Sequence, residues 1–537
     1  MRRFWGLLLT LLMCVNIASL ANDRLERASV ASQGIDERGL MNFIDTLCSL
    51  KNSEIHHIMV VRGGKVVAEA HFSPFGADDV HHLYSCSKTV TALAVGIAAD
   101  KGLLSLSDRV VDFFPDKIPQ DADSLLHEIT IQHLLTMTSG IRKDSLTMQR
   151  YSDWVLGWME QGMTATPGTK WDYDTMSTFM LSAIIQKVTG MRLLDFLNEN
   201  LFHPMGIIEA DWEESPGGIN TGGWGLRLNT ESQAKLGLLM LNYGQWKGRN
   251  LVSRKWVDDM TRCHKRFNEK KARPPKSLLS KIKYYLRLVF LTIKGWFTGE
   301  EPIENVFWDG YGYQTKILHH PSFESFFAIG LYGQTIFVDR KRDLVVVVNG
   351  AAAGYGNFIK AIWNVLYPAC LPKPRGESGL QPDVEKKLNS LEISPVKGEL
   401  NNTNTAGYAS GKEHRLAGNE LGWRKFSVAI SDSVCTLKVT QDDNTTMTVA
   451  CGYNRWNHNT VTVTPPSDLK AKNAFGGLKG DWDIAGSFAW TGPHMLDIHL
   501  LYTNWVTSRH IVVDFWHDEI SVTDNFMTEN KQTVMFN

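Results

Sequence analysis

The sequence predicts an α+β fold in which one antiparallel sheet is assembled from distant parts of the chain. Two β-rich runs flank Gly63-Gly64 within residues 55–72, and two more flank a charged turn within 326–350. Between them, from about 108 to 201, the residues follow mostly helical spacing. Strands that precede and follow a helical insertion belong to one sheet in such a layout, so we expect an antiparallel sheet flanked by helices.

Local signals support the first strand pair and the helix that follows it. Gly63 and Gly64 tolerate the positive φ angles of a tight hairpin turn. After the hairpin, Gly102 suits the end of a helix, and apolar residues before it recur at helical spacing: Val90, Leu93, Ala94, Ile97 and Ala98. The sequence therefore predicts a hairpin followed almost directly by an apolar helix.

Length and composition indicate a folded protein with more than one domain. A chain of 537 residues is long for a single core, and 43% hydrophobic with 21% charged residues is typical of globular proteins. The formal charge of -1 creates no long-range field for polyanions, so nucleic acid is not an expected partner.

A change of composition divides the chain after the predicted sheet. A stretch rich in Pro, Gly and charge follows a helical segment, and short alternating runs between turns begin near 407. We expect a first domain at 22–378, a linker at 379–406 and a separate β-rich domain, a sandwich or barrel, at 407–537. The last domain carries no chemical motif, so packing or partner binding is its expected role.

Two segments bear on localisation. Residues 1–21 combine two arginines, an apolar run and small residues before the end, as in a cleaved secretory signal, which predicts an exported protein, periplasmic or secreted. An uncleaved anchor is the alternative. Residues 276–297 have five basic and no acidic residues, with large apolar side chains near one helical face. This pattern is typical of peripheral membrane contact, and a packed helix or a lid over the site is the alternative.

Export would place the cysteines in a compartment that permits disulfides. Cys435 and Cys451 lie equally far from Asp443, at the centre of a predicted hairpin, so the two side chains would face each other across it. Two alternatives follow, a disulfide between them or two independent thiols.

The stretch LYSCSKTV carries the chemistry, because Ser85 stands three residues before Lys88. At this spacing on a helix, two side chains share a face about one turn apart. A serine hydroxyl needs a nearby base to act as a nucleophile, and an amine can be that base once burial or neighbouring positive charge lowers its pKa. Ser-x-x-Lys also occurs by chance, so the spacing alone leaves two polar residues at a helix start as the alternative.

The setting of this motif resembles a known superfamily. A Ser-x-x-Lys after a hairpin and at the start of an apolar helix, followed by ITIQHLLTMTSGI and WDYDT, resembles the serine β-lactamases and penicillin-binding proteins, in particular the class C β-lactamase-like serine hydrolases. The resemblance extends from about 55 to 370 and implies a hydrolase domain. It also implies that Ser85 is the acylated nucleophile, Lys88 its base and Tyr173 a proton relay.

Two departures from the family pattern concern the substrate. Where the family has Tyr-x-Asn, this chain has Thr175 in the third position, and where the family has Lys or His on the strand beside the serine, this chain has Leu331. A substrate carboxylate would therefore lack its cationic partner at that position. Both departures count against β-lactamase or D-Ala-D-Ala carboxypeptidase activity, which remains an alternative.

The same features, with GYGYQ at 310–314, look like the branch that contains 6-aminohexanoate-dimer hydrolase and related carboxylesterases. That resemblance implies an oxyanion hole formed by the backbone N–H groups of Ser85 and Gln334. It places Thr175, Tyr332 and Gly333 in contact with a small-molecule ester or amide substrate.

Other assignments are weaker. Cys86 points about 100° away from the Ser85 face of a helix, so it is expected to be a small core residue. The adjacent histidine pairs lack metal-ligand spacing, and we expect neither a metal site nor a cofactor. An inactive binding module on the same fold is a further alternative, although such a module has no chemical need for Ser85, Lys88 and Tyr173 together.

Overall fold

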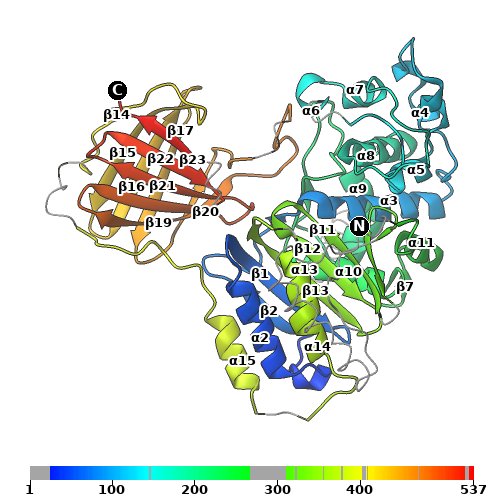
Figure 1. Ribbon diagram of the computed structural model, residues 1–537, viewed down its shortest axis with the longest axis horizontal. Helices are drawn as coiled ribbons and strands as arrows, with labels where there is room; N and C mark the ends of the chain where they lie inside the picture. The colour runs from blue at the N-terminus through cyan, green and yellow to red at the C-terminus, as the bar shows by residue number, and fades with distance from the viewer. Residues whose placement is uncertain are drawn as a thin grey trace, which may run out of the picture.

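The structure is a computed structural model that describes residues 24–143, 147–266, 310–320, 323–354, 356–376, 379–401, 407, 409–467, 469, 471–525 and 531–537. Its first domain is built on the predicted antiparallel sheet, in the strand order β2-β1-β13-β12-β11-β10-β9-β8 (Figure 1). The strands are β1 (Ser53–Arg62), β2 (Lys65–His71), β8 (Lys265–Arg266), β9 (Gly310–Tyr311), β10 (Lys316–His320), β11 (Phe323–Ile329), β12 (Thr335–Asp339) and β13 (Leu344–Ala352).

Distant segments meet in this sheet as the sequence predicts. Strand β1 pairs antiparallel with β13, where Ile58 lies opposite Val348, and with β2 through the Gly63-Gly64 turn. Ile58 and Val60 belong to the core on one face, whereas Met59 and Val61 belong to the core on the other, because side chains alternate along a strand. Both faces are therefore covered.

Helices cover the two faces. The face with Ile58 packs against α2 (Glu37–Cys48), α13 (Asn357–Ala361) and α14 (Tyr367–Ala369). The other face packs against α3 (Ser87–Asp100), α8 (Thr175–Thr189) and α10 (Thr230–Leu241). The remaining helices of this side are α4 (Val110–Phe113), α5 (Ile131–Leu135), α6 (Thr147–Arg150), α7 (Trp154–Met159), α9 (Leu193–Leu197) and α11 (Arg254–Met260).

Two small sheets complete the first domain. One has the order β3-β5-β4, and the other pairs β6 with β7. Their strands are β3 (His81–His82), β4 (Asp211–Trp212), β5 (Leu226–Leu228), β6 (Gln245–Trp246) and β7 (Arg249–Asn250). The three-stranded sheet matters for the site, because β3 leads into the segment that contains Ser85.

The C-terminal domain is one curled sheet, which confirms the predicted separate β domain (Figure 1). A bridge between Leu416 and Phe536 joins its two ends, so the sheet curls toward a barrel. The strands follow the order β14-β15-β16-β17-β19-β20-β21-β22-β23, with β18 on β19: β14 (His414–Arg415), β15 (Trp423–Ser431), β16 (Val434–Gln441), β17 (Thr446–Tyr453), β18 (Asn457–Val461), β19 (Trp482–Gly492), β20 (Met495–Tyr502), β21 (Ser508–Asp514), β22 (Glu519–Asp524) and β23 (Lys531–Met535).

Some predicted segments differ from expectation or lie outside the described residues. The predicted linker contains helix α15 (Gln381–Asn389), whose Val384 is buried in the core beside α2. The predicted signal at 1–21 and the basic segment at 276–297 lie outside the described residues. Among the helices that are described, none has the length and apolar character that crossing a membrane requires.

Cys435 and Cys451 lie directly opposite each other on β16 and β17, as the hairpin register predicts. Both are free thiols in the structure, so the disulfide alternative is not realised. Burial raises the pKa of Cys435 to about 12, and the pair packs in the core of the C-terminal sheet. The two residues therefore act as small apolar side chains.

Candidate active site

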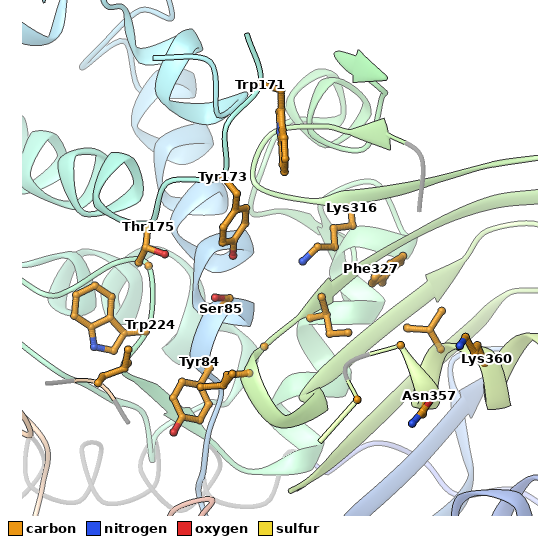
Figure 2. A pocket seen from close by; sticks show the side chains of 18 of the residues that line it. Tyr84, Ser85, Trp171, Tyr173, Thr175, Trp224, Lys316, Phe327, Asn357 and Lys360 are labelled. Carbon is orange, nitrogen blue, oxygen red and sulfur yellow. The ribbon is translucent and has the colours of Figure 1, made fainter. Parts of the chain in front are cut away.

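A cavity of about 710 Å³ contains Ser85 in its wall (Figure 2). Aromatic and aliphatic side chains dominate the wall, with a few polar groups among them. The lining residues are Tyr84, Ser85, Met148, Trp171, Tyr173, Thr175, Gly223, Trp224, Lys316, Phe327, Ile329, Gly330, Leu331, Gly354, Gly356, Asn357, Ile359, Lys360 and Leu469. A mostly apolar cavity with a few convergent polar groups is the usual form of a small-molecule site.

Ser85 lies in a 3₁₀ turn, Tyr84–Cys86, that runs directly into α3. The residue before the turn is held in place by strand β5, because the Leu83 N–H donates to the Leu226 carbonyl at 2.9 Å. Tyr84 has a positive φ of 43°, a strained conformation for a residue with a side chain. Such strain persists only where the surrounding structure holds it, and it is concentrated at functional sites.

Lys88 lies one turn further along, with its Nζ 3.0 Å from the Ser85 Oγ. The side chain is 1% exposed. Burial, and after it the positive charge of Lys316, lower the pKa of Lys88 to about 7. Near neutral pH, a large fraction of Lys88 is therefore an uncharged amine with a lone pair that can accept the serine proton.

A glycine loop orients this amine. The Lys88 Nζ donates to the Gly223 carbonyl at 2.7 Å, and the Thr91 hydroxyl donates to the Gly222 carbonyl at 2.8 Å. A Cβ on Gly223 would lie 2.9 Å from the Thr175 carbonyl oxygen, so only glycine allows this approach. This loop is absent from the sequence-based predictions, although the pair Gly222-Gly223 before Trp224 is a signal that could have indicated it.

Tyr173 and Thr175 both line the cavity because Asp174 between them caps α8. The Asp174 carboxylate accepts from the backbone N–H groups of Met176 at 3.0 Å and Ser177 at 2.9 Å. This is the arrangement of a helix N-cap, so Asp174 has a structural role. The residues on either side of it are then held at the start of the helix, facing the cavity.

Tyr173 approaches the serine-lysine pair. Figure 2 shows its hydroxyl pointing toward Ser85. The Lys88 Nζ lies 5.0 Å from the centroid of the Tyr173 ring. The structure thus brings the three predicted catalytic residues together at one place in the cavity.

Lys316 is a cavity residue that the sequence analysis missed. It begins β10, and its Nζ lies 5.5 Å from the centroid of the Tyr173 ring (Figure 2). Burial lowers the pKa of Lys316 to about 8. The preceding Gln314 ties this segment to the helices, because its side chain accepts from the Thr178 hydroxyl at 2.8 Å and donates to the Leu134 carbonyl at 2.8 Å. A lysine directly after the GYGYQ stretch was the available signal.

Gln334 does not line the cavity. Its side chain is fully buried and donates to the Gly350 carbonyl at 2.7 Å and to the Leu331 carbonyl at 3.2 Å. These bonds attach the turn after β11 to strand β13. Gln334 thus supports the turn, while Gly330 and Leu331 form the cavity wall.

Tyr332 and Gly333, predicted to contact substrate, are also absent from the wall. Tyr332 has a φ of 61°, which turns its side chain toward Tyr84, at 5.7 Å between ring centroids. It belongs to a core shared with the C-terminal domain. Gly333 has a φ of 94°, and a Cβ there would lie 2.7 Å from the Phe358 ring. The left-handed turn therefore directs both residues into packing, and of the three predicted substrate contacts only Thr175 reaches the cavity.

The competing assignments have structural explanations. Burial raises the pKa of Cys86 to about 12, and its Sγ donates to the Gln334 carbonyl at 3.3 Å, so it is a core residue. Two of the histidine pairs meet in the core, where the His56 Nδ1 lies 2.9 Å from the His81 Nε2. Burial lowers the pKa of His56 to about 3, so its ring is neutral and hydrogen-bonded. Within the described part of the chain, no cluster of His, Cys, Asp and Glu forms a metal site.

The pH dependence of hydrolysis should report the pKa of Lys88. The rate constant kcat/KM should rise with pH through about 7, because only the uncharged amine accepts a proton. Lys316→Gln removes a neighbouring positive charge, so the pKa of Lys88 should increase and the rising limb should move to higher pH. Lys360→Gln, which changes a more distant lining lysine, is the control. If the rising part of the pH profile did not move in Lys316→Gln, the charge of Lys316 would not affect the pKa of Lys88.

An antiparallel sheet covered on both faces, with a serine-lysine pair at the start of helix α3, defines a hydrolase of the β-lactamase fold. The Beta-lactamase family model matches residues 56–355, more than half of the chain, and the protein belongs to this family.

Individual relatives are distant. The 6-aminohexanoate-dimer hydrolase of Paenarthrobacter ureafaciens is 24% identical over 222 residues, 38% of this chain and 56% of that protein. Penicillin-binding protein 4* of Bacillus subtilis (strain 168) is 28% identical over 172 residues, 28% of this chain and 37% of that protein. The match thus spans about half or less of these curated relatives. Among solved structures, the octameric penicillin-binding protein homologue from Pyrococcus abyssi is 15% identical with a TM-score of 0.46, covering 93% of this chain and 99% of that chain.

Proposed function

We propose that the protein is an exported serine hydrolase that cleaves an ester or amide through an acyl-enzyme on Ser85. The observation that carries this proposal is the 3.0 Å distance from the Lys88 Nζ to the Ser85 Oγ, together with a Lys88 pKa of about 7. A base with a pKa near the working pH is available in its proton-accepting form and still basic enough to take a proton.

The reaction has two halves with the same groups. In the first, the Ser85 hydroxyl gives its proton to the adjacent Lys88 amine, and its oxygen bonds to the acyl carbon. The bond to the leaving alcohol or amine then breaks, and the leaving group takes the proton by way of Tyr173. In the second half, water gives up a proton to the same groups and attacks the acyl-enzyme, which releases the acid and restores the hydroxyl.

Two backbone N–H groups would hold the negatively charged oxygen of the tetrahedral intermediate. The sequence suggested Ser85 and Gln334 for this role. Leu331, the first residue of the turn η7 (Leu331–Gly333), lines the cavity, whereas Gln334 does not. We therefore propose the Leu331 N–H as an alternative to that of Gln334. A phosphonate adduct on Ser85 should put its oxygen about 3 Å from the Leu331 nitrogen, and a position beside the Gln334 nitrogen would reverse the choice.

A substrate series tests the proposed activity. The purified protein should hydrolyse p-nitrophenyl acetate and butyrate, and rapid acid quenching should reveal a mass increase equal to one acyl group. The cavity wall is mostly apolar, so uncharged acyl groups should be accepted. If neither esters nor short amides are cleaved and no serine probe labels the protein, the inactive binding module would replace this proposal.

Lys316 supports a second candidate, a substrate that carries a carboxylate, as penicillins and D-Ala-D-Ala peptides do. The strand position that holds Leu331 offers no cation, but Lys316 brings an amine to the same cavity from β10. A cationic side chain can pair with a carboxylate. The chromogenic cephalosporin nitrocefin, compared with p-nitrophenyl acetate, separates the two candidates. Preference for nitrocefin, lost in Lys316→Gln, would favour the second.

Export and membrane contact also belong to the proposal. The composition of residues 1–21 supports cleavage after Ala21, and the mass of the mature chain tests it. The basic residues within 276–297 support peripheral contact with anionic lipid. Sedimentation with anionic liposomes, compared with a variant whose lysines in this segment are replaced, tests that contact.

A further inference from the structure

One residue of the cavity wall comes from the C-terminal domain. Leu469 lies between β18 and β19, yet it lines the same cavity as Ser85. Its side chain packs against the core of the helical region and against the core of the C-terminal sheet. The cavity is therefore completed by a segment far from the serine motif in the chain.

The residues that follow Leu469 hold it in place. We refer to residues 471–479 as the strap; Figure 1 shows this orange segment leaving the C-terminal sheet toward helix α6. The Lys472 N–H donates to the Met148 carbonyl at 2.8 Å, and the Lys472 Nζ donates to the Arg150 carbonyl at 2.7 Å. Met148 itself lines the cavity, so the strap is bound at the cavity wall.

The other end of the strap is fixed beside β4. The Glu214 N–H donates to the Gly476 carbonyl at 2.7 Å, and the Lys479 N–H donates to the Asp211 carboxylate at 2.8 Å. Gly477 has a φ of 83°, and a Cβ there would lie 2.8 Å from the Trp212 carbonyl oxygen. Because the strap takes part in both bonds through its backbone, the bonds fix the path of the strap.

A buried ion pair adds to this attachment. Arg227 and Asp211 are 2% and 3% exposed and bond through two nitrogen-oxygen pairs. Arg227 donates two further hydrogen bonds across the interface, to the Asn504 and Lys479 carbonyls at 3.0 Å each. A buried charge is costly unless it is paired and hydrogen-bonded, so the two acceptors from the C-terminal domain stabilise this ion pair.

The interface also reaches the turn that holds the nucleophile. Trp505 of the C-terminal domain packs on His82, with ring centroids 4.1 Å apart, and His82 packs on Tyr84 at 4.1 Å. Tyr84 lines the cavity directly before Ser85 and belongs to the C-terminal core cluster. The two domains thus share a core at the site.

From these contacts we infer that the C-terminal domain is part of the substrate site and that Leu469 is a specificity-determining residue that contacts an apolar group of the substrate. The inference rests on the proposed ester or amide hydrolysis. Leu469, Met148 and Trp224 offer hydrocarbon and indole surface, which binds apolar groups by burial. Substrates with a long or bulky apolar part should therefore gain affinity that acetyl esters do not.

The experiment compares p-nitrophenyl octanoate with p-nitrophenyl acetate. In Leu469→Ala, the ratio of kcat/KM for octanoate to that for acetate should fall about tenfold, the effect of exposing about two methylene groups. Gly477→Val, which forces the strap to move, should lower the ratio in the same direction. Trp516→Ala, at an exposed position of the C-terminal domain outside the cavity wall, should leave it unchanged.

The outcomes separate this inference from the proposed function. Hydrolysis by the parent with an unchanged ratio in Leu469→Ala and Gly477→Val would overturn the inference alone. Equal loss for both esters would assign Leu469 a purely structural role and would also overturn it. If the parent cleaves no ester, the rate measurement is replaced by a calorimetric titration of the Ser85→Ala protein with p-nitrophenyl octanoate. Absence of octanoate binding, or binding that Leu469→Ala does not weaken, would then reject the inference.

Discussion

Ser85→Ala should abolish hydrolysis of p-nitrophenyl acetate, with a loss in kcat on the order of 10⁴ or more, because the nucleophile that forms the acyl-enzyme is gone. The parent treated with a fluorophosphonate should gain the mass of one adduct, and the variant should gain none. The fold should persist, because an alanine in the turn before α3 removes a single oxygen from the cavity wall. Circular dichroism and thermal unfolding check that the variant is folded.

Cys86→Ala is the matched control for this prediction. Cys86 is the neighbouring nucleophile, but its thiol is buried and its pKa is raised to about 12, so little thiolate exists at neutral pH. The control should keep both the adduct and hydrolysis. An adduct that persists in Ser85→Ala and disappears in Cys86→Ala would transfer the role to the cysteine.

Lys88→Met should reduce the rate of acylation by on the order of 10² or more, since a positioned general base contributes that much. Methionine has a similar length and suits the buried position, so the fold should remain. Lys88→Arg keeps a positive charge but has no form that accepts a proton near neutral pH. It should be as slow as Lys88→Met, which separates a general base from a purely electrostatic role. Stopped-flow measurement of p-nitrophenol release gives the acylation rate, and near-normal rates in either variant would show that another base serves.

The same variant provides a stability test that does not depend on substrate. The pKa of Lys88 is about 7 in the folded protein, against 10.5 for a free lysine. Between these pH values the unfolded chain binds more protons than the folded protein, so this group makes the free energy of unfolding rise with pH. Below about pH 7 both states are protonated and the contribution is constant. Denaturant titrations across this window should show a smaller rise in Lys88→Met, and an equal rise would contradict the lowered pKa.

The local features of this protein could be predicted from the order of its residues. The spacing of Ser85 and Lys88 fixes their relation, because three residues along a helical turn bring two side chains to one face. Periodicity identified the sheet, the helical insertion and the separate β domain, since burial of apolar residues repeats with the geometry of each element. The Tyr-Asp-Thr motif was identified by resemblance to a known family. The structure gives its physical basis, because Asp174 caps helix α8 and thereby holds Tyr173 and Thr175 at the cavity.

The distant residues that complete the site could not be predicted in this way, because the folding of the chain brings them together. The cavity is completed by Lys316 from strand β10 and by Leu469 from the C-terminal domain, and the Gly223 carbonyl binds Lys88 from a separate loop. These residues lie far from Ser85 in the chain, so residue spacing does not predict that they meet. The turn at 330–334 shows the limit most clearly. Its left-handed backbone at Tyr332 and Gly333 directs one side chain into the interdomain core and brings Leu331 to the cavity instead. Side-chain direction in such a turn depends on backbone angles and packing partners, which a motif in the sequence does not specify.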